Sequence, residues 1–168
     1  VALLEGIGSA AVTAPFTAAR DADCIFVIGA RPTENHPVAA TFFKQAAKRG
    51  AKLIVMDPRG QALARHAWQM LQFQNGTDVA MLNAMLTVVI EEKLYDQQYI
   101  QTYVEGFDAW KENIKDFTPE EMTPICGIEA DTLGSLMMLA AGSSATWPSS
   151  ARWSPMRWSS VRNSGNRA

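Results

Sequence analysis

The 168-residue sequence is poor in metal-binding side chains, with only two cysteines and two histidines. Cys24 and Cys126 lie far apart and neither belongs to a CxxC pair. This excludes a disulfide framework, a zinc ribbon and an iron–sulfur cluster held by this chain alone. His36 and His66 lack the spacing of a metal pair, and no HExxH, P-loop or Ser/His/Asp arrangement is present. We therefore expect neither a metal ligand nor a catalytic residue.

Long apolar runs are also missing, because no stretch approaches the roughly 18 apolar residues of a membrane-spanning helix. The first residues contain Glu5 and no basic region, so no secretory signal is expected and the expected location is cytoplasmic. Acidic residues end at Asp131: residues 1–142 hold 11 basic and all 17 acidic side chains, a formal charge of −6. This acidic body argues against nucleic-acid binding by the folded part.

The C-terminal residues 143–168 have a different composition. They contain eight Ser, four Arg and three of the five Trp, but no Leu, Ile or Phe. The arginines recur every five residues, which fits neither a helix face nor a strand face. Such a segment cannot bury enough apolar surface to order itself, so a disordered tail is expected. The abrupt change favours a shifted reading frame, and the alternative is a basic–aromatic arm for RNA or a membrane.

The body of the chain alternates short apolar runs with helical segments. The runs at 23–29 and 51–57, and a weaker one at 68–73, predict buried strands. The predicted helices are 11–20, 37–49 and 78–93, followed by the short helices 96–103, 107–116, 119–124 and 130–141. The predicted architecture is α/β: a Rossmann-like parallel sheet with flanking helices, then a helical segment and the disordered tail.

The spacing of apolar residues predicts which helix faces are buried. In the helix 37–49 the predicted core positions are Val38, Phe42 and Ala46. In the helix 78–93 they are Val79, Leu82, Leu86, Val89 and Ile90. The methionines at 81, 85, 137 and 138 are interpreted as core filling rather than as a cofactor site.

Ligands of parallel α/β sheets bind beyond the carboxyl ends of the strands, and three loops leave such ends here. Gly29 lets a ligand approach the backbone closely. Asp57 can accept two hydrogen bonds, from a ribose diol or from a guanine N1–H/N2–H edge. Gly76 and Thr77 present N–H groups at a helix N-terminus, which attracts phosphate, although simple helix capping explains them equally well. Together the loops predict a nucleotide site.

Other side chains near these loops allow two interpretations. Arg31 and Arg59 lie at strand ends, where they can meet phosphates or form salt bridges with nearby carboxylates. His36 adjoins the first loop and is more often a structural hydrogen-bonding residue than a catalyst at such a position. The GxGxxA match at residues 6–11 lacks the preceding strand of a dinucleotide fingerprint, so it does not predict an NAD site.

Several spaced blocks resemble one known family. They are ADCIFVIGARPTENHPVAATFFKQAAKRGAKLIVMDPRG, NGTDVAMLNAM, EEKLYDQQYI, VEGFDAW and FTPEEMTPICGIEADTL. In this order they resemble the molybdopterin oxidoreductases of the bis-molybdopterin guanine dinucleotide type, and among these the formate dehydrogenase alpha subunits. The resemblance covers about residues 1–142, which we expect to form a partial cofactor-binding domain separate from the tail 143–168.

The resemblance implies a cofactor and a reaction. The formate dehydrogenases of this family oxidise formate to carbon dioxide at a molybdenum or tungsten ion. This ion is held by two molybdopterin guanine dinucleotides and a cysteine or selenocysteine. It also implies an N-terminal [4Fe–4S] cluster and, from the ARPTENHP block, partner subunits carrying iron–sulfur clusters, flavin and NAD. The cofactor contacts that it implies are Gly29, Arg31, Glu34, Asn35, His36, Asp57, Pro58, Arg59, Gly76, Thr77 and Asp78.

The sequence also departs from the family pattern. The metal ligand and its neighbouring His should lie just before Val1, and an LWGMG-like strand is expected where Thr146–Ser149 stand. We therefore expect an inactive internal fragment whose partners are the remaining domains of the same subunit. The alternatives are another molybdopterin oxidoreductase such as a nitrate reductase, the middle domain of a thiamine-diphosphate enzyme, or a standalone nucleotide-binding domain.

Overall fold

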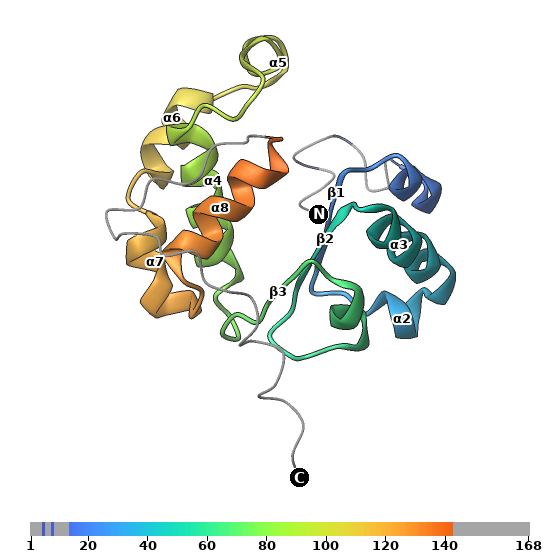
Figure 1. The fold of residues 1–168 in the computed structure, drawn as a ribbon. Helices are drawn as coiled ribbons and strands as arrows, with labels where there is room; N and C mark the ends of the chain where they lie inside the picture. Colours follow the sequence, from blue (N-terminus) through green and yellow to red (C-terminus); the bar gives the residue numbers. More distant parts are fainter. Residues whose placement is uncertain (1–4, 6–7, 9–13, 143–168) are drawn as a thin grey trace.

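The computed structural model describes residues 5, 8 and 14–142 (Figure 1). The predicted tail 143–168 lies outside the described residues, as do residues 11–13 of the predicted first helix. Of that helix, the described part contains a 3₁₀ helix, η1 (Phe16–Arg20), preceded by extended backbone at Pro15. Over the described residues the predicted helix is therefore present as this 3₁₀ helix, which begins after Pro15, because a proline cannot donate the backbone hydrogen bond of a helix interior.

Three parallel strands form the sheet, and their order is β1 (Cys24–Ile28), β2 (Lys52–Met56) and β3 (Gln69–Leu71). Phe26 pairs with Ile54, and Val55 pairs with Met70. Helices lie on both sides of the sheet (Figure 1). This confirms the predicted α/β class with a parallel sheet, flanking helices and a following helical segment.

The helix α3 (Pro37–Arg49) begins and ends at the predicted residues, because Pro37 fits the first turn and Gly50 accepts the left-handed φ of 107° that ends it. Its predicted buried face is wrong at Val38, which is 70% exposed. A spacing of four residues drifts around a helix of 3.6 residues per turn, so Val38 lies off the stripe that faces the sheet. The fully buried positions are Ala39, Ala40 and Ala46.

The opposite face of the sheet is covered by α4 (Asp78–Glu91), α7 (Pro119–Cys126) and α8 (Ala130–Ala140). The main buried cluster joins β2 and β3 to these helices and consists of Ile54, Met56, Leu71, Phe73, Met81, Ala84, Met85, Met122, Cys126, Ile128, Leu133 and Leu136. Met81, Met85 and Met138 are buried and Met137 packs against the cluster, which confirms their role as core filling.

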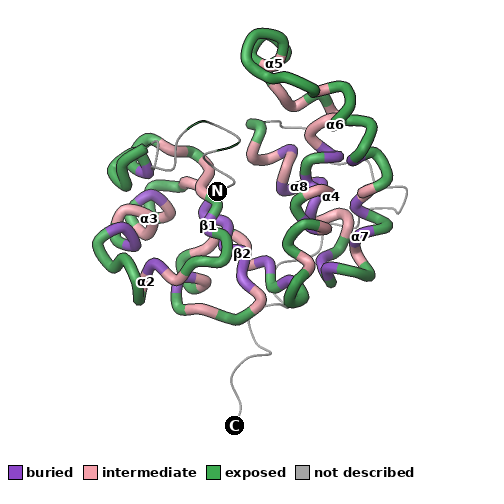
Figure 2. The backbone as a smooth tube through the Cα atoms, turned by 180° about the vertical axis from the view of Figure 1, so that it is seen from behind, coloured by how far each residue is buried: buried purple, intermediate pink, exposed green. Residues whose placement is uncertain are grey.

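The predicted buried face of α4 is wrong at Val79, Leu82 and Leu86, whereas Val89 and Ile90 are half-buried. Val79 is 69% exposed, and Leu82 and Leu86 are also exposed, whereas Met81, Ala84, Met85 and Val88 are buried. Figure 2 shows both buried and exposed stretches along α4. Apolar residues surround most of this helix, so periodicity alone cannot tell which stripe meets the sheet. The neighbouring α7 and α8 select the methionine stripe.

The remaining elements are short. The chain forms one helical turn, α2 (Pro32–Asn35), after β1 and a 3₁₀ helix, η2 (Ala62–His66), after β2. The helices α5 (Gln97–Tyr103) and α6 (Phe107–Ile114) follow α4, and α5 lies farthest from the sheet and buries no residue (Figure 1). Within the described residues no helix is long and apolar enough to cross a membrane.

Candidate functional site

The carboxyl ends of the three strands lie at one edge of the sheet, because all pairings are parallel (lower edge in Figure 1). Hydrogen bonds continue past the strand ends into the loops. The N–H of Gly29 donates to the carbonyl of Met56 at 2.9 Å, and the N–H of Asp57 donates to the carbonyl of Leu71 at 3.1 Å. The first residues of the two predicted ligand loops are therefore held side by side.

Asp57 is buried, with only 4% of its surface exposed. Its Oδ1 accepts a hydrogen bond from the backbone N–H of Arg59 at 2.8 Å, and its Oδ2 accepts one from Nε2 of Gln61 at 3.2 Å. Each carboxylate oxygen has two lone pairs, so each keeps one for a ligand. Pro58 follows at the turn, its carbonyl accepts from Gln72 at 3.0 Å, and the residue Arg59 is exposed.

The loop after β1 differs from the open segment that the sequence predicts, since its residues 32–35 form the helical turn α2. Arg31 donates to Glu34 at 3.4 Å, so these two candidate residues form an exposed ion pair with each other. His36 lies between α2 and α3, with its ring 5.9 Å from that of Phe16, and Asn35 is exposed beside it. In the structure the His36 ring therefore makes an aromatic contact with Phe16.

The third loop carries Gly76, Thr77 and Asp78 at the start of α4. Thr77 occupies the N-cap position, but its hydroxyl donates back to the carbonyl of Gln74 at 2.7 Å and no side chain caps the helix. The first-turn N–H groups of α4 are thus left for water or a ligand. Gln74 donates to the carbonyl of Cys126 at 2.9 Å, and over residues 14–142 no hydrogen bond joins this loop to those of Gly29 and Asp57.

Three buried polar atoms without a hydrogen-bond partner lie at this edge: Nε of Arg31, Oγ1 of Thr33 and Oε1 of Gln61. Within the described residues, these three are the buried side-chain nitrogen and oxygen atoms that lack a hydrogen-bond partner. A buried polar group that lacks a partner costs about 1–3 kcal/mol, so such groups are rare unless something supplies the missing bond. Their gathering at two neighbouring loops is what a site for a polar ligand requires, and it fits the nucleotide end of a dinucleotide cofactor.

Sequence reasoning did not single out two members of this group, Thr33 and Gln61. Thr33 lies within the loop that the sequence marks, but nothing in its type distinguishes it from its neighbours. Gln61 bonds to the carbonyl of Ala30, 31 residues away, and to Asp57. A polar side chain four residues after a strand-terminal aspartate is a signal that could have drawn attention to Gln61.

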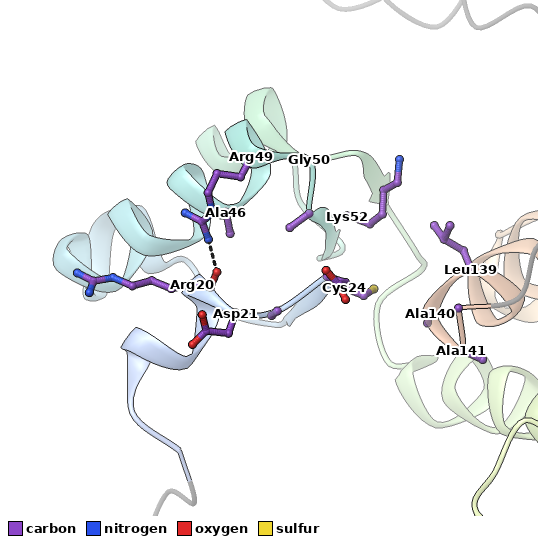
Figure 3. A pocket seen from close by; sticks show the side chains of 14 residues that line it. Arg20, Asp21, Cys24, Ala46, Arg49, Gly50, Lys52, Leu139, Ala140 and Ala141 are labelled. Atoms are coloured by element: carbon purple, nitrogen blue, oxygen red, sulfur yellow. Dashed lines mark hydrogen bonds between the residues drawn. The ribbon is translucent and has the colours of Figure 1, made fainter.

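A separate hollow of about 820 Å³ lies at the opposite edge of the sheet, between the starts of β1 and β2 and the end of α8 (Figure 3). Its basic side chains already have partners: Arg49 donates to the carbonyl of Arg20 at 2.6 Å, and Lys52 lies over the ring of Trp68 at 5.3 Å. Cys24 also lines the hollow, and burial raises the pKa of its thiol. These contacts do not resemble a nucleotide site.

Residues 14–142 contain no group of three or more His, Cys, Asp or Glu side chains that could hold a metal ion. The polar groups at the strand ends can bind hydroxyl, amide and phosphate groups of a ligand. The arrangement is therefore suited to holding a nucleotide.

The pattern of the family described as "Molybdopterin oxidoreductase" matches residues 6–152, and the chain belongs to this family. The F420-dependent formate dehydrogenase subunit alpha of Methanocaldococcus jannaschii is 41% identical over 126 residues, which cover 75% of this chain and 19% of that protein. A nitrate reductase of Symbiobacterium thermophilum is 37% identical over 123 residues, 67% of this chain and 16% of that protein.

A solved structure is also similar. The acetylene hydratase from Pelobacter acetylenicus superposes with a TM-score of 0.65 at 30% sequence identity, over 75% of this chain and 18% of that chain. The chain thus spans about a fifth of the length of its relatives. Membership of this oxidoreductase family excludes the thiamine-diphosphate alternative. The cofactor of the family is a molybdopterin.

Proposed function

We propose that this chain is the part of a formate dehydrogenase catalytic subunit that holds the nucleotide end of a molybdopterin guanine dinucleotide. The observation that carries the proposal is the group of partnerless buried polar atoms on Arg31, Thr33 and Gln61 beside the Asp57 carboxylate. The family match and a formate dehydrogenase relative at 41% identity support the choice of cofactor and reaction.

Each loop has its own part in this proposal. Gly29, with a φ of 58° and open space where a Cβ would lie, lets the ligand approach the backbone. Asp57 supplies hydrogen-bond acceptors, and the free N–H groups at the start of α4 attract a phosphate. When bound, the cofactor supplies the molybdenum or tungsten centre at which formate loses two electrons and a proton to give carbon dioxide.

The whole protein's activity needs residues beyond those of this chain. We propose that the remaining domains of the same subunit supply the other half of the cofactor site, the metal ligand and a [4Fe–4S] cluster. We further propose that iron–sulfur and NAD- or flavin-binding subunits take the electrons onward, in the cytoplasm. The ARPTENHP resemblance supports NAD as the acceptor, whereas the relative from Methanocaldococcus jannaschii is by its name F420-dependent.

Calorimetric titration of the chain with GDP and ADP tests the binding role. We expect GDP to bind with a dissociation constant of about 1 mM, a weak affinity because half of the interdomain site is absent. We expect ADP to bind more weakly than GDP. Asp57→Asn should weaken GDP binding about tenfold, whereas the control Asp108→Asn on α6 should leave it unchanged. A chain that is folded by circular dichroism but gives no heat with GDP would contradict the proposal.

The sequence of the parent gene tests whether the whole protein is a formate dehydrogenase. For a formate dehydrogenase we expect a cysteine or selenocysteine codon followed by a histidine codon just upstream of Val1. We also expect a second reading frame beyond residue 145 that encodes an LWGMG-like strand. A nitrate reductase is the second candidate, because the Symbiobacterium relative is 37% identical. If this second candidate is correct, the purified parent enzyme should reduce nitrate and should not oxidise formate.

A further inference from the structure

Gln61 connects the two loops of the candidate site. It occupies the position before η2, and its side-chain amide donates to the carbonyl of Ala30 at 3.1 Å and to Oδ2 of Asp57 at 3.2 Å. An amide NH₂ group has two N–H bonds, so both donors of Gln61 are used within the protein. The side chain therefore holds the loop after β1 against the loop after β2.

These donors also fix the direction in which the side chain presents its acceptor. Because both N–H bonds are occupied, only Oε1 is left for a further contact, and this atom is buried without a partner. Oδ2 of Asp57 accepts from the same amide and keeps one lone pair. Oε1 of Gln61 and Oδ2 of Asp57 are thus two hydrogen-bond acceptors that are held at a fixed position relative to each other.

We propose that Gln61 is a positioning residue that turns Asp57 and its own Oε1 into a double acceptor for two adjacent hydrogen-bond donors of the ligand. This inference rests on the proposed nucleotide-binding function. On a guanine nucleotide, adjacent donors occur in two places, the ribose diol and the N1–H/N2–H edge of the base. Gln61 discriminates among nucleotides without contacting the phosphates.

The experiment compares three ligands that differ by single donors. GDP carries both donor pairs, 2′-deoxy-GDP lacks one hydroxyl, and inosine diphosphate lacks the N2 amino group. We expect the chain to prefer GDP over one of the two analogues by about tenfold, the usual effect of one lost hydrogen bond in a ligand. The analogue that binds more weakly identifies the edge that the double acceptor holds.

The variant Gln61→Leu keeps the approximate shape of the side chain but removes its amide. We expect it to lose the preference for GDP over the analogue while still binding GDP through the phosphates. The matched control is Gln72→Leu, since Gln72 lies near the same turn and bonds to the carbonyl of Pro58 rather than to Asp57. This control should keep the preference of the unaltered chain.

A second variant keeps the test decisive if Gln61→Leu does not fold. Gln61→Glu retains two oxygen acceptors but lacks the N–H donors that orient Asp57, so it should also lose the preference. The proposal is overturned if the unaltered chain binds all three ligands equally, or if both folded variants keep its preference. A chain that binds no GDP at all overturns the proposed function together with this inference, whereas an unchanged preference in the variants leaves the proposed function intact.

Discussion

Phe26 of β1 and Ile54 of β2 are paired in register, yet Ile54 is fully buried whereas Phe26 is 38% exposed. The next pair on the same face shows the same difference, because Met56 is buried and Ile28 is 40% exposed. The helices α4, α7 and α8 thus cover β2 and β3 but leave this face of β1 partly bare. Within the described sheet β1 is an edge strand, and its residues CIFVI carry no charge and no proline.

An uncharged apolar edge strand can pair with the same strand of a second copy. We expect the chain to self-associate through β1 at high concentration, and Phe26→Lys to weaken this association at least about tenfold. Sedimentation velocity over a range of concentrations measures the effect. Val79→Lys on α4 is the matched control, since it also replaces an exposed apolar residue by lysine. Equal weakening by both variants would rule out pairing through β1.

The buried stripe of α4 predicts opposite outcomes for two neighbouring positions. Met81 is fully buried in the main cluster, so Met81→Ala should lower the free energy of unfolding by about 2–5 kcal/mol. Val79 is exposed, and Val79→Ala should change it by no more than about 0.5 kcal/mol. Urea denaturation followed by circular dichroism gives both values. The reverse order would mean that the stripe containing Val79 is the one that packs on the sheet.

The contrast between α3 and α4 shows what local sequence can determine. The bounds of α3 could be predicted because Pro37 and Gly50 act through their own backbone preferences. The buried face of α4 could not, since its orientation depends on α7 and α8, which follow later in the chain. Periodicity identifies a face only when one side of a helix is polar.

The candidate site was predictable to a similar extent. The topology of a parallel sheet places Gly29 and Asp57 at one edge, and the structure brings their loops together. The role of Gln61 depends on a contact with residue 30, and the pairing of Arg31 with Glu34 depends on the turn α2. Neither follows from residue type and spacing alone.

Glu91, at the end of α4, provides a test of pH dependence. Partial burial raises the pKa of its carboxyl, and the nearby carboxylates of Glu120 and Glu92 add to the effect. A raised pKa in the folded state means that folding favours the protonated form, so stability is lost as pH rises through that pKa. Glu91→Gln should therefore stabilise the chain at pH 7 and have no effect well below pH 4.5.

The size of this effect is limited because solvent screens a carboxyl that is only partly buried. We expect a gain of less than about 1 kcal/mol at pH 7, measured from urea denaturation at several pH values. Glu105→Gln is the control, since Glu105 is exposed on a different segment. A gain that is equal at pH 4 and pH 7 would show that the ionisation of Glu91 is not its cause.

The two cysteines should differ in reactivity for separate physical reasons. Burial raises the pKa of Cys24, more than the hydrogen bond from the backbone N–H of Ile25 lowers it. The thiolate is the reactive form, so near pH 8 Cys24 should react with a disulfide reagent more slowly than free cysteine. Its rate should continue to rise with pH above 9.0, its ordinary value, where free cysteine approaches its plateau.

Cys126 is completely buried in the main cluster, so it should react only when the chain unfolds. The variant Cys126→Ser isolates Cys24 and should reproduce the single slow reaction of the folded chain. In denaturing urea the unaltered chain should release two equivalents of the reagent chromophore at the rate of free cysteine. If Cys24→Ser instead left the slow reaction of the folded chain in place, Cys126 would be the accessible thiol. Cys126 would then be less tightly packed among α7, β3 and α4 than the structure shows.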